Sequence, residues 1–341
     1  MNTHSVNLAQ IGCGYWGPNL LRNFSTTKHC SVKYVVETSE DRRKFVESNY
    51  PRTKAIADLD TVMNDGEVNA VVIATPAATH YSIAKRALAN GKHVFVEKPL
   101  AMSVTEADEL VTLSHQNKLV LMVGHTFLYN RAVEYLRKLI LSGELGQVYY
   151  AYTQRLNLGV IRSDVNVMWN LAPHDISILC HVLDEMPLTV SASGTDYIQK
   201  DIEDVVFMCL EFPNRIRARI HVSWLDPNKV RRVTVVGSKK MVVYDDVADD
   251  KIIIYDKGID GQGAMPFDDP GAAKLVHRVG DIVLPKIDLK EPLKVQSDHF
   301  VDCVLSGITP LSGPDNGRAV VAILAAAQES LKYNGKVITL G

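Results

Sequence analysis

The chain has 341 residues, of which 46% are hydrophobic and 22% are charged. This length exceeds the roughly 250–300 residues at which a single core stops growing, so we expect two domains, and the composition excludes a disordered, collagenous or coiled-coil protein. The 37 basic and 39 acidic side chains give a net charge of −2, which predicts neither a nucleic-acid nor a membrane partner.

The first 125 residues predict a parallel sheet covered by helices, because short β-branched runs alternate with helical periods. The expected strands are 6–11, 32–37, 70–74, 93–97 and 120–123. The clearest helices between them are 81–89, which ends at Asn90-Gly91, and 104–115. Five strands with interleaved helices indicate a doubly wound α/β unit.

The pattern changes from about residue 126. A helix at 131–141 is followed by alternating segments that predict antiparallel strands with one solvent-exposed face, at 148–154, 205–212, 215–224 and 230–236. Arg215, Arg217 and Arg219 alternate as that exposed face requires; the alternative is a functional basic stripe.

The remaining elements complete the second half of the chain. Residues 257–271 are dense in Gly, Asp and Pro and predict a mobile loop. The segments 295–305 and 318–331 predict amphipathic helices, with Gly307 and Gly335 as their stop signals.

The sequence gives no sign of export or of a membrane span. The longest apolar stretch, 319–327, is about half of a bilayer span, and the first residues lack the regions of a secretory signal, so we expect a cytoplasmic protein. The cysteines are odd in number and far apart, which predicts reduced core residues rather than disulfides or a zinc site. They are Cys13, Cys30, Cys180, Cys209 and Cys303.

The first strand ends in a G-x-G-x-x-G motif that precedes a helical run at 19–24. Its residues are Gly12, Cys13, Gly14, Tyr15, Trp16 and Gly17. Glycines let the chain turn and let backbone N–H groups approach a pyrophosphate, which the positive end of the following helix attracts. With an acidic residue about twenty positions later, at the end of the second strand, the motif predicts a dinucleotide site.

That acidic residue is Glu37. We expect it to accept hydrogen bonds from the ribose hydroxyls of the adenosine, and its negative charge would repel a 2′-phosphate. This favours NAD over NADP as the cofactor. In the alternative, Glu37 is an ordinary surface carboxylate and Arg42 or Arg43 clamps the phosphate of NADP.

Two more loops leave the carboxyl ends of strands, where open α/β sheets bind their ligands. The residues that we expect at the cofactor from these loops are Thr75, Pro76, His80, Glu97 and Lys98. Pro99 excludes helical backbone at Lys98, so Lys98 lies at a turn and points to the cofactor cleft. The alternative is a surface lysine with a glutamate partner.

In this order and spacing, the motifs resemble the family of glucose–fructose oxidoreductase, inositol dehydrogenase and MocA. The resemblance continues in Gly124-His125, in Trp-Asn-Leu-Ala-Pro-His-Asp at 169–175, and in Glu291-Pro292-Leu293 followed by His299-Phe300. It therefore covers nearly the whole chain. The Glu97-Lys98-Pro99 triplet is its most specific part and the glycine motif its least specific part.

The resemblance implies an α/β Rossmann domain over 1–125 and an α+β domain with an open, mostly antiparallel sheet over 126–294. It implies that helices in 295–341 pack back on the first domain, and that the protein forms a homodimer or homotetramer through the sheet. The family's catalytic residues fall on Lys98 and His174. Family members commonly have an aspartate where this chain has Asn170, so that charge is absent or comes from Asp175.

His174 precedes an apolar run, 175–182, that predicts a helix. We therefore expect His174 at a helix N-terminus, where the dipole disfavours the protonated imidazole and leaves a neutral ring suited to proton relay. The alternatives are a core or surface histidine, and a metal site shared with His181. Seven residues separate these two histidines, which is too far for a shared ion, so no metal is expected.

These residues predict the oxidation of a secondary alcohol, in which hydride passes to nicotinamide while a base removes the hydroxyl proton. A free lysine, with a pKa of about 10.4, is too basic for this role. The cationic nicotinamide and desolvation both disfavour its ammonium form, which makes Lys98 a proton acceptor. His174 would hold the same hydroxyl or share the proton.

Residues 155–164 and 169–175 are similar to the subgroup that oxidises UDP-N-acetylglucosamine or its uronate at the sugar 3-position, in nucleotide-sugar and polysaccharide biosynthesis. The substrate residues that this implies are Arg155, Asn157, Arg162, Asn170 and His174. The two arginines would bind a carboxylate or diphosphate, or else form surface ion pairs. One alternative is a dehydrogenase of inositol or of a free sugar, or a ketosugar reductase. The other is a non-catalytic NAD-binding regulator, which Asn170 in place of the family's aspartate suggests.

Overall fold

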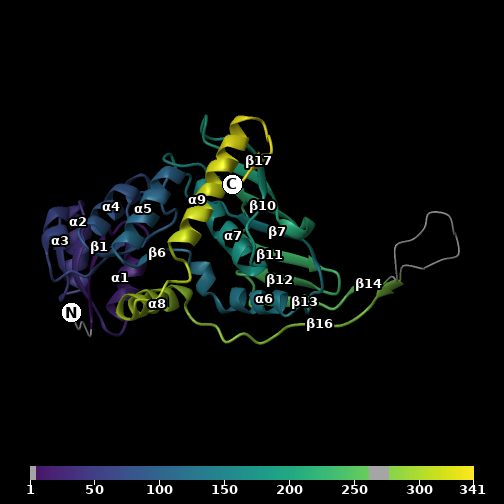
Figure 1. Ribbon diagram of the computed structural model, residues 1–341, viewed down its shortest axis with the longest axis horizontal. Helices are drawn as coiled ribbons and strands as arrows, with labels where there is room; N and C mark the ends of the chain where they lie inside the picture. Colours follow the sequence, from purple (N-terminus) through teal and green to yellow (C-terminus); the bar gives the residue numbers. More distant parts are fainter. Residues whose placement is uncertain (1–4, 261–275) are drawn as a thin grey trace. The chain divides into compact units, whose positions relative to one another are not determined.

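The computed structural model describes residues 5–260 and 276–341 and divides into two compact units (Figure 1). The first unit comprises residues 1–130 and 290–325, and the second comprises 131–289 and 326–341. The sequence motifs place the boundaries at 125 and 294 and assign the whole C-terminal segment to the first domain. In the structure, residues 326–341 group with the second unit.

The first unit contains a six-stranded sheet in the order β3-β2-β1-β4-β5-β6, and every neighbouring pair is parallel. The strands are β1 Val6–Ile11, β2 Cys30–Val36, β3 Lys54–Ile56, β4 Ala70–Ile73, β5 His93–Val96 and β6 Leu121–Val123. This order confirms the expected Rossmann-like doubly wound sheet. The three-residue strand β3 was not expected, because it is too short to show a pattern.

Helices alternate with these strands along the chain. They are α1 Gly17–Ser25, α2 Glu40–Asn49, α3 Leu59–Asn64, α4 His80–Ala89 and α5 Val104–Gln116, with α8 Pro292–Ser306 added from the C-terminal part of the chain. Ser39, Asp58 and Ser103 cap α2, α3 and α5 through side-chain oxygens that accept backbone N–H groups of the first turn.

An aromatic cluster fixes α8 in the first unit. Phe24 of α1, Phe95 of β5 and Phe300 of α8 are fully buried and pack edge to face, with ring centroids 5.7 to 6.0 Å apart. A segment distant in sequence therefore completes the core beneath β1 and β5. Helix α8 thus packs in the core of the first unit. Helix α9, Pro314–Lys332, contributes residues to both units.

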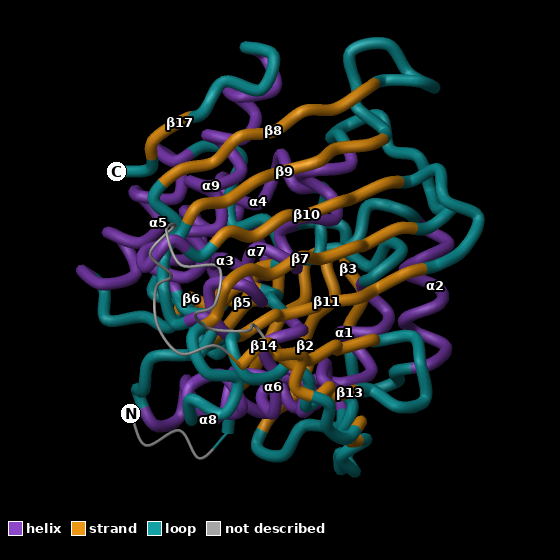
Figure 2. Tube along the Cα trace, turned by 90° about the vertical axis from the view of Figure 1, so that its right-hand side faces the viewer, coloured by secondary structure: helices purple, strands orange, loops and turns teal. Residues whose placement is uncertain are grey.

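The second unit contains a nine-stranded sheet in the order β16-β13-β12-β11-β7-β10-β9-β8-β17 (Figure 2). The strands are β7 Val148–Leu156, β8 Thr189–Thr195, β9 Val205–Glu211, β10 Arg217–Ser223, β11 Val230–Gly237, β12 Met241–Asp245, β13 Ile252–Tyr255, β16 Ile282–Val283 and β17 Ile338–Thr339. All pairs are antiparallel except β7 with β10, which is parallel. The expectation of a mostly antiparallel sheet is confirmed.

One face of this sheet is covered and the other is exposed. Helix α7, Val167–Leu183, packs on β7, β9 and β10, and α6, Arg131–Leu141, packs beside α7. In β10 the exposed Arg217 and Arg219 alternate with the buried Ala218 and Ile220, as expected of a half-exposed strand. Arg215 lies outside β10, in the short turn of 3-10 helix Pro213–Arg215, because the strand begins two residues later than predicted.

Part of the segment expected to be a loop, 257–271, forms a strand. Residues Gly258–Asp260 form β14 and pair with β15, Val276–Arg278, while 261–271 lie outside the described residues. All five cysteines carry free thiols; Cys13 and Cys303 are buried and the others are half-buried. Among the described residues, no helix has the length and apolar character that a membrane crossing requires.

Candidate functional site

The glycine motif forms the loop between β1 and α1. Gly12 has a φ of +92°, and a Cβ there would lie 2.6 Å from the carbonyl oxygen of Ala74. A Cβ at Gly17 would lie 2.8 Å from the carbonyl oxygen of Gly12, whereas a Cβ at Gly14 would meet nothing within 4 Å. The first and third glycines thus allow tight packing, and the second borders open space. This arrangement fits a loop that brings its backbone against a pyrophosphate.

Gln10 supports this loop from inside the sheet. Its side chain is fully buried in β1, and its Nε2 donates to the carbonyl oxygens of Gly12, at 2.9 Å, and Gly17, at 3.0 Å. The amide therefore holds the two ends of the loop together. Sequence reasoning missed Gln10, although a polar residue inside a strand that is buried on both faces is a signal that could have found it.

Glu37 follows β2 and contacts the same loop. Its Oε2 accepts from the backbone N–H of Cys13 at 2.7 Å, and its Oε1 accepts from the N–H of Ser39 at 2.9 Å. Burial raises the pKa of Glu37, but these hydrogen bonds outweigh burial and leave the pKa below its ordinary value. The carboxylate is therefore ionised at neutral pH, as the recognition of ribose hydroxyls requires.

The two arginines of the NADP alternative contact backbone carbonyls. Arg43 donates to the carbonyl oxygens of Glu37, at 2.8 Å, and Thr38, at 2.7 Å, while Arg42 lies 3.5 Å from that of Gly14. The Arg43 guanidinium is thus tied to the loop that carries Glu37. This geometry favours the carboxylate rather than a phosphate clamp as the polar group at this end of β2.

His80 joins the loop after β4 to the turn after β5. Its buried imidazole places Nδ1 at 2.8 Å from the carbonyl oxygen of Pro99 and Nε2 at 2.9 Å from that of Thr75. Carbonyl oxygens only accept, and a neutral imidazole has a single N–H, so both contacts are hydrogen bonds only when the ring is protonated. Thr79 hydrogen-bonds Pro76 and closes the loop after β4.

Lys98 is half-buried in the turn that follows β5. The preceding Glu97 is buried, and its Oε2 accepts from the backbone N–H of Lys98 at 3.3 Å, while its Oε1 accepts from the indole Nε1 of Trp16 at 3.0 Å. Burial raises the pKa of Glu97 to about 7, and the charge of Lys98 opposes that rise. Tyr15, the neighbour of Trp16, is 88% exposed.

His125 follows β6 and was noted in the sequence only as part of the resemblance. Its side chain is 1% exposed, and neither ring nitrogen hydrogen-bonds any part of the described chain. Burial, and then the charge of Lys98, lower the pKa of His125 to about 3. The ring is therefore neutral, and it lies within the electrostatic reach of Lys98.

His174 lies inside a helix, which corrects the expectation of a helix N-terminus. Helix α7 begins at Val167, where Asn166 is the N-cap and accepts from the backbone N–H of Trp169 at 3.1 Å. The helix continues through Pro173, so the proline does not mark its start. His174 is therefore too far from the first turn for the dipole to act on it.

The two arginines expected at the substrate both pair with carboxylates. Arg155 of β7 donates through Nε and Nη2 to Asp175 of α7, at 2.7 and 3.3 Å, and these side chains are 5% and 1% exposed. Arg162 forms a second two-bond pair, with Asp164, at 2.8 and 2.6 Å. Asp175, suggested as a replacement for the missing family aspartate, is therefore the partner of Arg155.

Asn170 and Asn157 both contact the end of β10. Asn170 accepts from the indole Nε1 of Trp224 at 3.2 Å, and the backbone N–H of Asn157 donates to Ser223 at 3.2 Å. Trp224 was missed, because a buried tryptophan after a strand reads as core and nothing in the sequence indicates its partner. An aspartate at 170 would accept the same indole N–H, so the asparagine keeps this contact without the charge.

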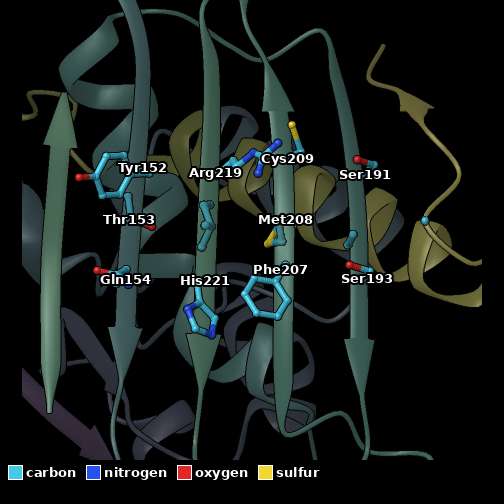
Figure 3. Close-up of a pocket in the computed structure, with 13 residues that line it drawn as sticks. Tyr152, Thr153, Gln154, Ser191, Ser193, Phe207, Met208, Cys209, Arg219 and His221 are labelled. Carbon is cyan, nitrogen blue, oxygen red and sulfur yellow. The ribbon is translucent and has the colours of Figure 1, made fainter. Parts of the chain in front are cut away.

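The predicted residues thus fall into two groups. The first unit brings together the glycine loop, Glu37, and the turns that carry Thr75, Pro76, His80, Glu97 and Lys98. The second unit carries Arg155, Asn157, Arg162, Asn170 and His174 on β7, the loop after it, and α7. None of the second group lines the depression on the exposed face of the sheet, which lies over β7, β8, β9 and β10 (Figure 3).

The comparisons with known proteins identify one family. Residues 6–125 match the oxidoreductase family with an NAD-binding Rossmann fold, GFO_IDH_MocA, and residues 133–243 match a GFO/IDH/MocA C-terminal domain. A 2,7-anhydro-N-acetylneuraminate hydratase of Escherichia coli is 27% identical over 61% of this chain and 59% of its own. The chain thus spans about three fifths of that relative's length.

A second relative is matched over more of its length. The UDP-N-acetylglucosamine 3-dehydrogenase of Acidithiobacillus ferrooxidans is 27% identical over 73% of this chain and 76% of its own. The fold matches a crystal structure of GenD2 from gentamicin A biosynthesis in complex with NAD. The TM-score is 0.83, with 24% identity over 100% of this chain and 98% of that one.

Replacing Glu37 should weaken the binding of NAD and reduce the preference over NADP. If Glu37 binds the ribose as expected from the sequence, Glu37→Ser removes the charge-assisted hydrogen bonds to it, so we expect NAD to bind roughly 10- to 100-fold more weakly, with no comparable loss for NADP. Titration calorimetry with both cofactors measures this. Glu47→Ser, on an exposed position of α2, is the matched control. An unchanged NAD preference in Glu37→Ser would contradict the assigned role.

Proposed function

Because the chain belongs to the GFO/IDH/MocA family of oxidoreductases, we propose that it oxidises a secondary hydroxyl of a sugar to a ketone with NAD. The observation that carries this proposal is the position of Lys98, in a turn that Glu97 and Trp16 tie to the glycine loop. A basic side chain held at the edge of a dinucleotide site is what proton removal from an alcohol requires.

The residues of the chain divide the work of the reaction. Bound NAD supplies a hydride acceptor at its nicotinamide ring. The glycine loop and the N-terminus of α1 hold the pyrophosphate, and Glu37 holds the adenosine ribose. Lys98 takes the hydroxyl proton as the C–H bond breaks and becomes an ammonium group. His174 orients the same hydroxyl or shares its proton.

We propose a UDP-N-acetylhexosamine or its uronate, oxidised at the 3-hydroxyl, as the substrate. The similarity to a UDP-N-acetylglucosamine 3-dehydrogenase over 73% of the chain supports this choice. Asn157, Asn170 and His174 would face the sugar, and Arg162 would face the acidic groups. The product is a 3-keto nucleotide sugar, which an aminotransferase of nucleotide-sugar biosynthesis can aminate.

A neutral sugar or inositol is the second candidate substrate, and one observation favours it. Both arginines expected to bind an anion are neutralised by carboxylates, Arg155 by Asp175 and Arg162 by Asp164. The buried pair of Arg155 and Asp175 is costly to open, because either side chain without the other would be an uncompensated buried charge. A substrate without a carboxylate or diphosphate would leave both pairs intact.

A substrate panel separates the two candidates. The purified protein with NAD should form NADH, followed by its absorbance, with UDP-N-acetylglucosamine or its uronate, and these ligands should raise its melting temperature. A hundredfold excess over the dissociation constant stabilises by about 2.7 kcal/mol. Turnover of inositol or a monosaccharide without any UDP-sugar selects the second candidate. NAD binding with no turnover across the panel contradicts the proposed oxidation and leaves the non-catalytic regulator.

Lys98→Met should abolish most turnover while leaving the binding of NAD. The substitution keeps much of the side-chain volume and removes the proton acceptor, so we expect kcat to fall by roughly 10²- to 10⁴-fold. Steady-state kinetics and NAD calorimetry measure the two effects. Lys44→Met, which removes an exposed lysine paired with Glu40, should change neither. If turnover is unaltered in Lys98→Met, Lys98 is not the base.

We also propose that two copies of the chain associate through the exposed face of the nine-stranded sheet. Tyr150 and Tyr152 stack on this face with ring centroids 6.5 Å apart. Phe207 stacks on His221 with ring centroids 4.2 Å apart (Figure 3). Phe207 remains 52% exposed. Exposed aromatic side chains gathered on one face are typical of a protein interface.

A charge on this face should separate the copies. In Phe207→Asp we expect a dimer or tetramer to dissociate to monomer, because an unpaired carboxylate buried in an interface is strongly unfavourable. Size-exclusion chromatography with light scattering measures the mass. Leu141→Asp, at the exposed end of α6, which packs beside α7 on the covered side of the sheet, is the control. A wild-type protein that is monomeric at micromolar concentration would contradict the proposed association.

A further inference from the structure

Glu97 lies where three segments of the first unit meet. Its carboxylate is buried and accepts from the indole Nε1 of Trp16, in the glycine loop, at 3.0 Å. Its other oxygen accepts from the backbone N–H of Lys98, in the turn after β5, at 3.3 Å. The third segment is the start of the loop after β6, at Gly124. One side chain therefore joins the phosphate-binding loop to the backbone of the proposed base.

Gly124 leaves the space that the carboxylate fills. A Cβ at Gly124 would lie 2.9 Å from the Cδ and from both oxygens of Glu97. Real Cβ atoms do not approach other atoms so closely, so any other residue at this position would displace the carboxylate. The glycine, the indole donor and the backbone donor together fit a carboxylate in this one orientation.

The three segments that meet at Glu97, and the start of α4, carry titratable groups. Lys98 acts on Glu97 by charge, and His125 adjoins Gly124 and is neutral, because its pKa is lowered to about 3. In the glycine loop, burial raises the pKa of the Cys13 thiol to about 11, and Tyr15 is exposed. His80, at the start of α4, contacts the carbonyl of Pro99.

We propose that Glu97 is a positioning residue of the reaction proposed above, which holds the Lys98 turn against the glycine loop and supplies the negative charge that stabilises Lys98 after it takes the proton. In that step the O–H bond of the alcohol breaks and an N–H bond forms on Lys98. The electron pair of the breaking C–H bond leaves as hydride to bound NAD. The ammonium group then lies within the electrostatic reach of the Glu97 carboxylate, which offsets its charge.

The protonation of Lys98 can be measured without any substrate. Brief labelling with acetic anhydride modifies the neutral amine, and mass spectrometry of the peptide carrying Lys98 gives its reactivity at each pH. In Glu97→Gln the ammonium form loses a neighbouring negative charge, so we expect half-maximal labelling about 1 pH unit lower than in the wild type. Glu291→Gln, which breaks an ion pair with Arg22 elsewhere in the same unit, is the matched control and should show no shift.

The pH dependence of turnover gives a second readout. Oxidation needs neutral Lys98, so the acidic limb of kcat/KM should move to lower pH in Glu97→Gln by the same interval as the labelling profile. Trp16→Phe keeps the carboxylate and removes its indole donor, which weakens the ionised form. It should therefore give a smaller shift in the same direction. A purely structural role for Glu97 would lower activity without moving either profile.

The outcomes separate this proposal from the proposed function. If the Lys98 labelling profiles of the wild type and of a folded Glu97→Gln variant coincide, the proposed role of Glu97 is overturned. If circular dichroism shows that Glu97→Gln does not fold, the Trp16→Phe variant, changed at a partly exposed position, tests the proposal instead. An unshifted Lys98 labelling profile in Trp16→Phe then overturns the proposal. If no substrate is turned over, the oxidation fails as a function, and the labelling still decides whether Glu97 controls Lys98.

Discussion

The cofactor half of this protein depends on one close approach, between the end of β1 and the end of β4. The carbonyl of Ala74 occupies the place where the Cβ of a side chain at residue 12 would lie, so only glycine fits at this turn. Gln10 then holds the loop closed from below. Because the loop is fixed, Trp16 is in position to reach Glu97, and the turn that carries Lys98 is joined to it.

The parallel sheet and its loops could be predicted because their signals are local. Buried parallel strands such as β4 and β5 appear as short, mostly apolar runs. The bounds of β1 and α6 match the prediction residue for residue. The family resemblance is confirmed by both domain matches. The weakly amphipathic α2, with Val46 as its single buried residue, and the three-residue β3 lack such signals.

The parts that could not be predicted are contacts between distant segments. The apolar run at 175–182 suggested that a helix starts at His174, whereas the helix begins after the cap at Asn166, packs on the sheet and continues through Pro173. Arg155 suggested an exposed anion ligand, but its strand places it opposite Asp175 beneath α7. The sequence does not reveal that Arg155 and Asp175 form a pair, because the two residues are twenty positions apart and lie on different elements. Tertiary packing decided both.

Two carboxylates that contact the glycine loop differ in how their charge is stabilised. Glu37 is partly buried and receives backbone N–H groups from Cys13 and Ser39, which lower its pKa and keep it charged. Glu97 is more deeply buried and receives weaker support, so burial raises its pKa to about 7. A carboxylate that is ionised at neutral pH suits the recognition of hydroxyl groups. One whose ionisation depends on a neighbouring ammonium suits a site where a proton arrives and departs, because its charge is stabilised most when Lys98 is protonated.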